Sequence, residues 1–166
     1  MNVLFTALLS ASLLAALAWP QAACVRPEDL RRLTGARWTG TLTYTDYSSN
    51  RRVSIPSNLN VTVRDGDSTS WVFEYEYPKE PKANGRREVT LGRDGATLDG
   101  EAVVERTSLE DGTLRVVTEK RGTDNDRAAL FRFTYLIGAS SFSVRKEVRR
   151  DGDDRFFERN VYSWSR

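Results

Sequence analysis

The sequence contains no histidine, and Cys24 is its only cysteine among 166 residues. Without histidine the commonest general base is missing, so neither a Ser-His-Asp nor a Cys-His catalytic arrangement can be built. A zinc site could draw only on carboxylates and Cys24, and a lone cysteine cannot form an internal disulfide. We therefore expect a protein that is not an enzyme, with no catalytic residue, no metal and no cofactor.

The sequence also lacks a charge excess of one sign. It has 25 basic and 23 acidic residues, a formal net charge of +2, and the two signs are interleaved along the chain. Nucleic-acid-binding proteins usually show a basic stripe that follows the phosphate backbone. Nucleic acid is therefore not an expected partner.

The first 23 residues contain no Asp, Glu, Lys or Arg. Residues 3–19, VLFTALLSASLLAALAW, form an apolar run that Pro20 and the small residues of QAAC follow. This layout predicts a secretory signal peptide over residues 1–23, and hence an exported protein, periplasmic or secreted. An uncleaved anchor is the alternative, although the run is short for a membrane span of about 20 residues.

Cys24 lies where cleavage of the leader is expected. Its position after Ala22 and Ala23 resembles the lipobox of bacterial lipoproteins, in which the cysteine at the new N-terminus bears the lipid; Gln21 stands where that motif usually has an aliphatic residue. Ordinary cleavage, after Ala18 or Ala23, would instead release a soluble protein. Cys24 is thus a candidate lipidation site, and contact with the membrane is expected only through the signal or a lipid anchor.

A single short helix is predicted between the leader and the rest of the chain, within the segment 24–36. In PEDLRRLTG (27–35), Pro27 suits the first helical position and Gly35 the end of a helix. Acidic Glu28 and Asp29 suit the positive N-terminal end of a helix.

From Arg37 onward apolar and polar residues alternate, which is typical of strands with one buried face. The clearest segments are 39–47, 58–64, 71–77 and 130–137. Asp-Gly occurs five times and Asn84-Gly85 adds a sixth turn pair; such pairs favour tight hairpins. The sequence therefore predicts an all-β domain over 37–166, an antiparallel up-and-down barrel of about eight to ten strands. A two-sheet sandwich is the alternative.

The segment LTGARWTGTLTY (33–44), preceded by the short helix and followed by a meander, resembles the lipocalin-like, or calycin, barrels. The family has Gly-x-Trp, whereas this sequence has Gly35-Ala-Arg-Trp38. The resemblance implies that Trp38 packs under an arginine from the end of the barrel, either Arg159 or Arg166. The chain is also similar in general style to exported bacterial barrels. By analogy, these resemblances imply a non-catalytic binder of a small apolar or amphiphilic ligand.

The stretch SVRKEVRRDGDDRFFERN (143–160) predicts a highly charged hairpin. A two-residue turn at Asp151-Gly152 would place three pairs of opposite charge across the strands, whereas a four-residue loop would place three like-charged pairs. The first register directs Lys146, Arg159 and Val161 inward. It directs three aromatic residues outward unless a bulge switches the face, namely Phe156, Tyr162 and Trp164.

Two inward cations in an aromatic barrel would suit a ligand with an apolar body and an acidic group. The candidate ligand-binding residues are Lys146, Arg159, Trp71, Phe73, Tyr75, Phe131, Phe133 and Tyr135. The same aromatic residues could instead fill a solid core, and the two cations could pair with Glu105 or Glu119.

Two other classes of function remain open at this point. Outward aromatic residues would suit a structural or interaction module of the cell envelope, with or without a lipid anchor. Paired carboxylates would suit an enzyme, with Glu74, Glu76, Glu105 and Glu119 as the candidates. The sequence carries no signal for the oligomeric state.

Overall fold

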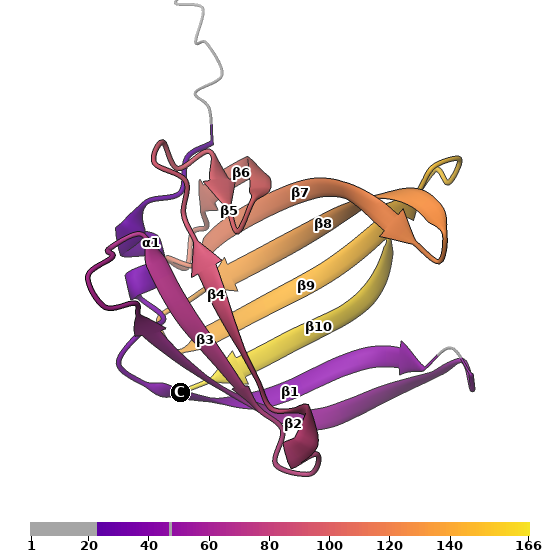
Figure 1. Cartoon of the computed structure of the whole chain (residues 1–166), viewed down its shortest axis with the longest axis horizontal. Coiled ribbons are helices and arrows are strands. Elements are labelled where there is room, and N and C mark those ends of the chain that lie inside the picture. Colours follow the sequence, from indigo (N-terminus) through magenta and orange to yellow (C-terminus); the bar gives the residue numbers. More distant parts are fainter. Residues whose placement is uncertain (1–22, 47) are drawn as a thin grey trace, which may run out of the picture.

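The computed structural model describes residues 23–46 and 48–166. Ten antiparallel strands form one sheet that curls into a nearly closed barrel, and one short α-helix precedes them (Figure 1). The predicted up-and-down barrel is therefore confirmed. The predicted signal peptide lies outside the described residues, apart from residue 23.

The strands follow one another around the barrel, and their order in the sheet is β4-β3-β2-β1-β10-β9-β8-β7-β6-β5. Their bounds are β1 Arg37–Asp46, β2 Arg51–Val63, β3 Ser70–Glu76, β4 Gly85–Thr90, β5 Thr97–Leu98, β6 Glu101–Ser108, β7 Leu114–Asp124, β8 Arg127–Ile137, β9 Ser141–Arg150 and β10 Phe157–Ser165. A short 3-10 helix, η1 (Pro81–Ala83), lies between β3 and β4.

The barrel closes between β4 and β5, which are neighbours in the chain. Leu91 and Leu98 form an isolated antiparallel bridge there, and two backbone hydrogen bonds flank it, from Gly92 N to Thr97 O (2.9 Å) and from Asp99 N to Thr90 O (2.6 Å). By contrast, the first and last strands, β1 and β10, share a full ladder from Thr39–Ser165 to Tyr44–Asn160. The closing seam is therefore in the middle of the sequence.

Two of the hairpins turn within two residues, because both central residues adopt positive φ. Between β5 and β6 these are Asp99 (φ 54°) and Gly100 (φ 74°), as the Asp-Gly pair predicts. Between β7 and β8 they are Asn125 (φ 49°) and Asp126 (φ 62°), which the glycine pattern does not identify. The pair Asn84-Gly85 is not such a turn, since Gly85 already begins β4 after η1.

Helix α1 (Pro27–Arg31) lies across one end of the barrel, and the β1–β2 and β7–β8 connections project from the other (Figure 1). It is shorter than the predicted 27–35. Asp29 anchors it, because its carboxylate accepts hydrogen bonds from Arg26 N and from both Nε and Nη2 of Arg106, each at 2.8 Å. Burial alone would raise the pKa of Asp29, but the hydrogen bonds from Arg106 and Arg26 N, together with the positive charges of Arg106 and Arg32, outweigh it and hold the pKa below its ordinary value.

The main core fills the α1 end of the barrel. Its largest fully buried side chains are Trp38, Trp71 and Phe142, and Leu30 and Leu33 cover them from the side of α1. The Trp38 indole donates a hydrogen bond to Leu33 O at 2.8 Å. The Arg166 guanidinium lies over the Trp38 ring, 4.6 Å from its centroid, so the arginine that the calycin resemblance implies is Arg166 rather than Arg159.

The predicted register of the β9–β10 hairpin is wrong. Val148 pairs with Phe157 and Glu147 with Glu158, and then a bulge at Arg159 shifts the pairing so that Lys146 faces Asn160. The like charges are tolerated because Glu158 pairs with Arg145 of β9 (3.2 Å) and with Arg52 of β2 (2.8 Å), which lies beyond β1. Cross-strand charge pairs contribute only about 0.2–1 kcal/mol each, less than the burial of large aromatic side chains.

The bulge decides which side chains of β10 enter the barrel. Beyond it, Tyr162 and Trp164 point inward, and Trp164 is stacked on Phe142 and on Tyr162 with ring centroids 5.2 and 5.0 Å apart. Val161, predicted to face inward, instead lies on the outer surface among charged residues of β7, β8 and β9. The bulge thus reverses the alternation of β10 and turns its aromatic residues Tyr162 and Trp164 into the barrel.

Candidate binding cavity

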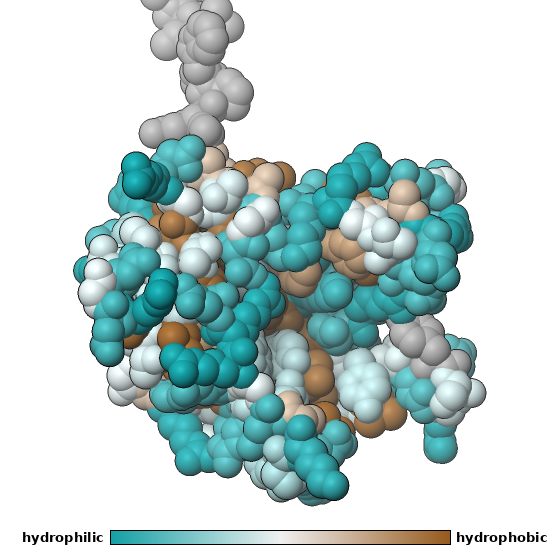
Figure 2. Space-filling model, in the orientation of Figure 1, coloured by the Kyte–Doolittle hydropathy of each residue, from teal (hydrophilic) through white to brown (hydrophobic). Residues whose placement is uncertain are grey.

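The interior of the barrel is hollow. The inner cavity has a volume of about 460 Å³ and lies between α1 and the middle of the strands. Its walls are formed by Leu30, Leu33, Phe73, Tyr75, Arg87, Val89, Leu98, Lys120, Phe131, Phe133, Tyr135, Phe142, Val144, Lys146, Asn160 and Tyr162. Figure 2 shows apolar residues at the bottom of a hollow on the viewed face, with hydrophilic residues around it.

The barrel is hollow because ten strands enclose more space than their inward side chains fill; about eight strands give an interior that side chains just fill. The volume lies in the range of about 300–1,000 Å³ that is usual for small-molecule sites, whose linings are mostly apolar with a few polar groups.

Six of the eight predicted ligand-binding residues line the inner cavity. They are Phe73, Tyr75, Phe131, Phe133, Tyr135 and Lys146. Trp71 does not line it, and its side chain belongs to the main core. Burial raises the pKa of Tyr75 to about 12 and also raises that of Tyr135, so both phenols stay neutral at ordinary pH.

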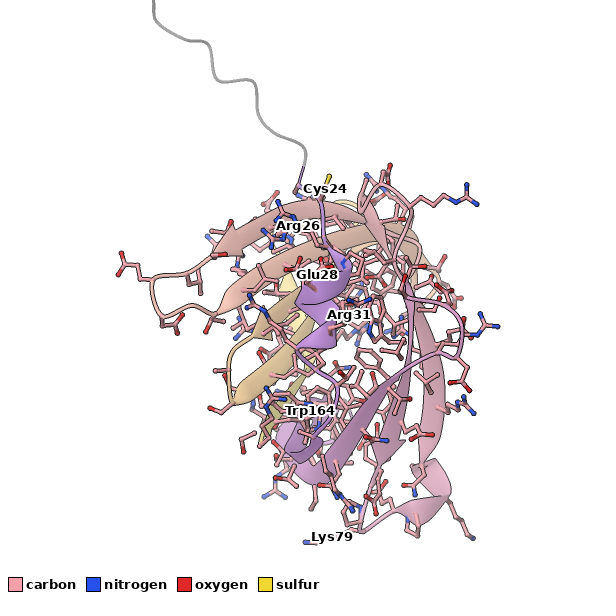
Figure 3. The ribbon with its side chains drawn as sticks, turned by 90° about the vertical axis from the view of Figure 1, so that its left-hand side faces the viewer. Cys24, Arg26, Glu28, Arg31, Lys79 and Trp164 are labelled. Carbon is pink, nitrogen blue, oxygen red and sulfur yellow. The ribbon has the colours of Figure 1, made fainter. Side chains whose placement is uncertain are left out.

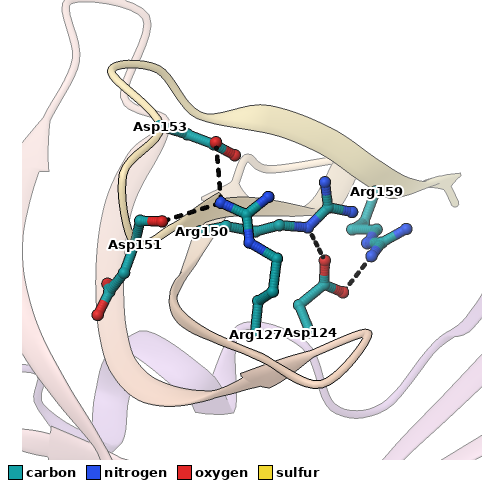
Figure 4. Close-up of polar contacts among 6 residues, drawn as sticks. All are labelled: Asp124, Arg127, Arg150, Asp151, Asp153 and Arg159. Carbon is teal, nitrogen blue, oxygen red and sulfur yellow. Dashed lines mark hydrogen bonds and ion pairs between the residues drawn. The ribbon is translucent and has the colours of Figure 1, made fainter.

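Arg159 does not line the inner cavity, because it forms an ion pair with Asp124 at the open end of the barrel (Figure 4). Asp124 also accepts a hydrogen bond from Arg150 Nε at 2.8 Å. Burial would raise the pKa of Asp124, but the hydrogen bonds from Arg159 and Arg150, together with their positive charges, outweigh it and hold the pKa below its ordinary value. Asp124 is thus a partner of Arg159 that the sequence did not suggest, whereas Glu105 and Glu119 pair with Arg115 and Arg132.

Lys146 is the inward cation of β9. Its Nζ lies over the rings of Phe131 and Phe133, 4.8 and 5.8 Å from their centroids, and it forms no hydrogen bond or ion pair within residues 23–46 and 48–166. Burial, and secondarily repulsion from Lys120 and Arg159, lower its pKa from the ordinary value. The ammonium therefore lies over aromatic faces, and the carboxylates of Asp124 and Glu101 act on it only at longer range, without an ion pair.

Two further cations line the cavity, and both have acidic partners. Lys120 Nζ lies 2.9 Å from Oε1 of Glu101, a fully buried carboxylate that also accepts a hydrogen bond from Thr118 Oγ1 at 2.6 Å. Arg87 forms an ion pair with Asp99. Among the three cations of the lining, Lys146 is consequently the one whose charge is least compensated.

A second cavity, the outer cleft, lies beyond Lys146. It has a volume of about 440 Å³ and is lined by Leu42, Tyr44, Thr45, Asp46, Ser48, Lys146, Arg159 and Asn160. Lys146 and Asn160 line both cavities, so they stand between them.

Alternation along the sequence did not identify several of the lining residues. The bulge at Arg159 hides Asn160 and Tyr162, since strict alternation in the predicted register turns both outward. Lys120 could have been predicted from the sequence, because it continues the inward row of Val116 and Thr118 on β7.

The carboxylates proposed for an enzyme do not gather at the cavity. Glu74 accepts a hydrogen bond from Asn60 (3.0 Å), Glu105 pairs with Arg115, and Glu119 accepts two hydrogen bonds from Arg132 (2.7 and 2.8 Å). Glu76 pairs with Arg37. Each of these carboxylates thus has its own partner and lines no part of the inner cavity.

Within the described part of the chain, no group of three or more acidic or cysteine residues is placed to hold a metal ion. The helices that the structure describes include none with the length and apolar character needed to cross a membrane. Cys24 is partly exposed at the α1 end of the barrel, where the described chain begins (Figure 3).

No protein-family model matches this chain, and no curated protein is significantly similar to it in sequence. The architecture is compatible with a calycin-like barrel.

Proposed function

We propose that this protein is an exported, lipocalin-like barrel that binds one small amphiphilic anion in its inner cavity, without catalysing a reaction. The apolar part of the ligand would lie against Phe73, Tyr135 and Phe142 toward α1. Its acidic group would lie at Lys146.

The observation that supports this proposal is the environment of Lys146. Its ammonium is half-buried beside the mostly apolar inner cavity and lies over the rings of Phe131 and Phe133, without a hydrogen bond or ion pair to the described residues. A buried charge is costly unless it is paired, and an anionic group of a ligand would supply the missing partner. A charge-assisted hydrogen bond contributes about 1.5–3 kcal/mol.

The test is the binding of decanoate to the purified protein, measured by calorimetry. We expect Lys146→Gln to weaken binding by about 10-fold or more, because it removes the charge and leaves the apolar wall intact. Lys79→Gln is the matched control, since Lys79 points away from the barrel in the loop after β3 (Figure 3).

Native mass spectrometry of the protein as purified would detect a ligand that it already holds. The proposal fails if no ligand is retained and no member of a panel of fatty acids and aromatic acids binds.

The alternative, an interaction module of the cell envelope, depended on an exposed aromatic patch. Trp164 is buried, and the Tyr162 hydroxyl lies 2.8 Å from that of Tyr77 on the cavity side. Phe156 alone remains near the surface, with the guanidiniums of Arg132 and Arg149 over its ring at 3.9 and 5.1 Å. We therefore do not favour that alternative.

A further inference from the structure

One row of side chains separates the inner cavity from the outer cleft. Lys146 of β9 faces Asn160 of β10, and Asn160 faces Tyr44 of β1. Lys146 and Asn160 line both cavities, and Tyr44 lines the outer cleft. The cation thus lies at the boundary between the inner cavity and the outer cleft rather than at the outer rim.

Resting on the proposed function, we infer that the anionic group of the ligand is internal, with the apolar chain on one side and a second hydrogen-bonding group on the other. The chain occupies the inner cavity, the anion lies at Lys146 and Asn160, and the second polar group occupies the outer cleft. Monoalkyl phosphodiesters have this arrangement, and in N-acylserines a hydroxyl lies beside the carboxylate.

The inner cavity leaves no other place for the anion. Toward α1 it is walled by Leu30, Leu33 and Phe142, which offer neither charge nor hydrogen bonds. Lys120 and Arg87 are already neutralised by Glu101 and Asp99. An anion in either place would lose its hydration and gain no cation that still needs a partner, which costs free energy.

The row offers hydrogen-bonding groups beside the ammonium. The Asn160 amide and the Tyr44 hydroxyl are half-buried and form no hydrogen bonds within the described part of the chain. The amide can donate to the anion, and the phenol can donate to or accept from a neighbouring group.

Beside the apolar surface of Leu42 and Tyr44, the outer cleft carries polar groups beyond this row. Thr45, Asp46 and Ser48 contribute to its lining, and the Asp46 carboxylate accepts hydrogen bonds from Ser48 N (2.9 Å) and Ser48 Oγ (2.7 Å). A hydroxyl or amide of a ligand can form hydrogen bonds with these groups, whereas an alkyl chain cannot.

The experiment compares two pairs of ligands on the full-length protein by calorimetry. Decyl phosphate and decanoate end in their anion, whereas decyl phosphoglycerol and N-decanoylserine carry a hydroxyl beyond or beside it. We expect the extended member of at least one pair to bind about 5- to 30-fold more tightly, the effect of one or two added hydrogen bonds. The pair that shows the gain identifies the anion as a phosphodiester or a carboxylate.

Variants then locate the second polar group. We expect Tyr44→Phe, which keeps the ring, to abolish the gain of the extended ligand and to leave the terminal ligand's affinity within about 2-fold. Asn160→Ala should weaken both members of the pair, whereas Asn60→Ala, on the exposed face of β2, should weaken neither.

The outcomes separate the two proposals. Equal affinity for both members of both pairs overturns the internal anion, whereas binding of decanoate through Lys146 would still support the proposed function. If none of the four ligands binds, the proposed function fails as well. A gain that persists unchanged in Tyr44→Phe also contradicts the inference, because the second group then lies elsewhere.

Discussion

The Arg166 guanidinium lies 4.6 Å from the centroid of the Trp38 ring, and it donates hydrogen bonds from Nε and Nη2 to Ala139 O at 3.1 and 2.9 Å. It therefore joins β1 to the β8–β9 connection across the end of β10. The contact covers the base of the core, since Trp38 is fully buried beneath it.

Replacing Arg166 by Ala should lower the free energy of unfolding by about 1 kcal/mol, because an exposed cation–π contact and its hydrogen bonds are lost together. Urea denaturation measures the change. Arg155→Ala is the control, since Arg155 is exposed in the β9–β10 connection and should change stability by less than about 0.5 kcal/mol. Equal stability of the two variants would contradict a structural role for Arg166.

Gly40 should not tolerate a side chain. A Cβ at this position of β1 would lie 1.9 Å from Ser163 O of β10, so Gly40→Ala must displace the strand. We expect a loss of about 2 kcal/mol or more by thermal or urea unfolding. Gly85→Ala is the matched control, because its nearest atom would be 3.9 Å away, and a comparable loss there would refute the explanation.

Acid should weaken the open end of the barrel through Asp124. Its pKa is lowered in the folded state from the ordinary 3.8, so its stabilising contribution is present above that value and is lost as the pH falls toward the lowered pKa. Asp124→Asn should therefore lower stability at pH 7 and flatten the decline below about pH 4. Urea titrations at pH 7 and pH 3 measure the loss of unfolding free energy on acidification. Asp154→Asn, at an exposed position, should leave that loss unchanged.

Binding of a carboxylate at Lys146 should weaken at high pH. The free protein loses the Lys146 proton below the ordinary value of 10.5, because its pKa is lowered by burial, whereas a bound anion stabilises the ammonium and raises that pKa. Decanoate binding should therefore take up a proton between neutral pH and about pH 10. Calorimetry in two buffers of different ionisation enthalpy measures this uptake, and Lys146→Gln should abolish it. The same uptake in both proteins would assign it to another group.

The fold was predictable because its determinants are local. Alternation along segments such as 71–77 assigns a buried and an exposed face, and five Asp-Gly pairs mark positions where the chain turns. The Asp-Gly pattern does not predict the turn at Asn125 and Asp126, because neither residue is glycine, although Asn and Asp also adopt positive φ.

The site was predictable only in part, because a single residue changes the phase of β10. Without the bulge at Arg159, alternation turns Asn160 and Tyr162 outward, and with it both line the cavity. Summing charge pairs could not reveal the bulge, since it forms where the burial of Tyr162 and Trp164 outweighs weaker interactions across the hairpin. The carboxylate partner of Arg159 also lies far away in sequence, at Asp124.

The seam between β4 and β5 has a kinetic consequence. Every other junction of the barrel is a ladder of pairs, whereas the seam is one bridge, Leu91–Leu98, with its two flanking hydrogen bonds. Transient opening starts where the fewest bonds must break together, so we expect the amide hydrogens of Gly92 and Asp99 to exchange with solvent before those of β8 and β9. Because Val89 and Leu98 beside the seam also line the cavity, such openings would set how fast solvent and solute exchange across that wall.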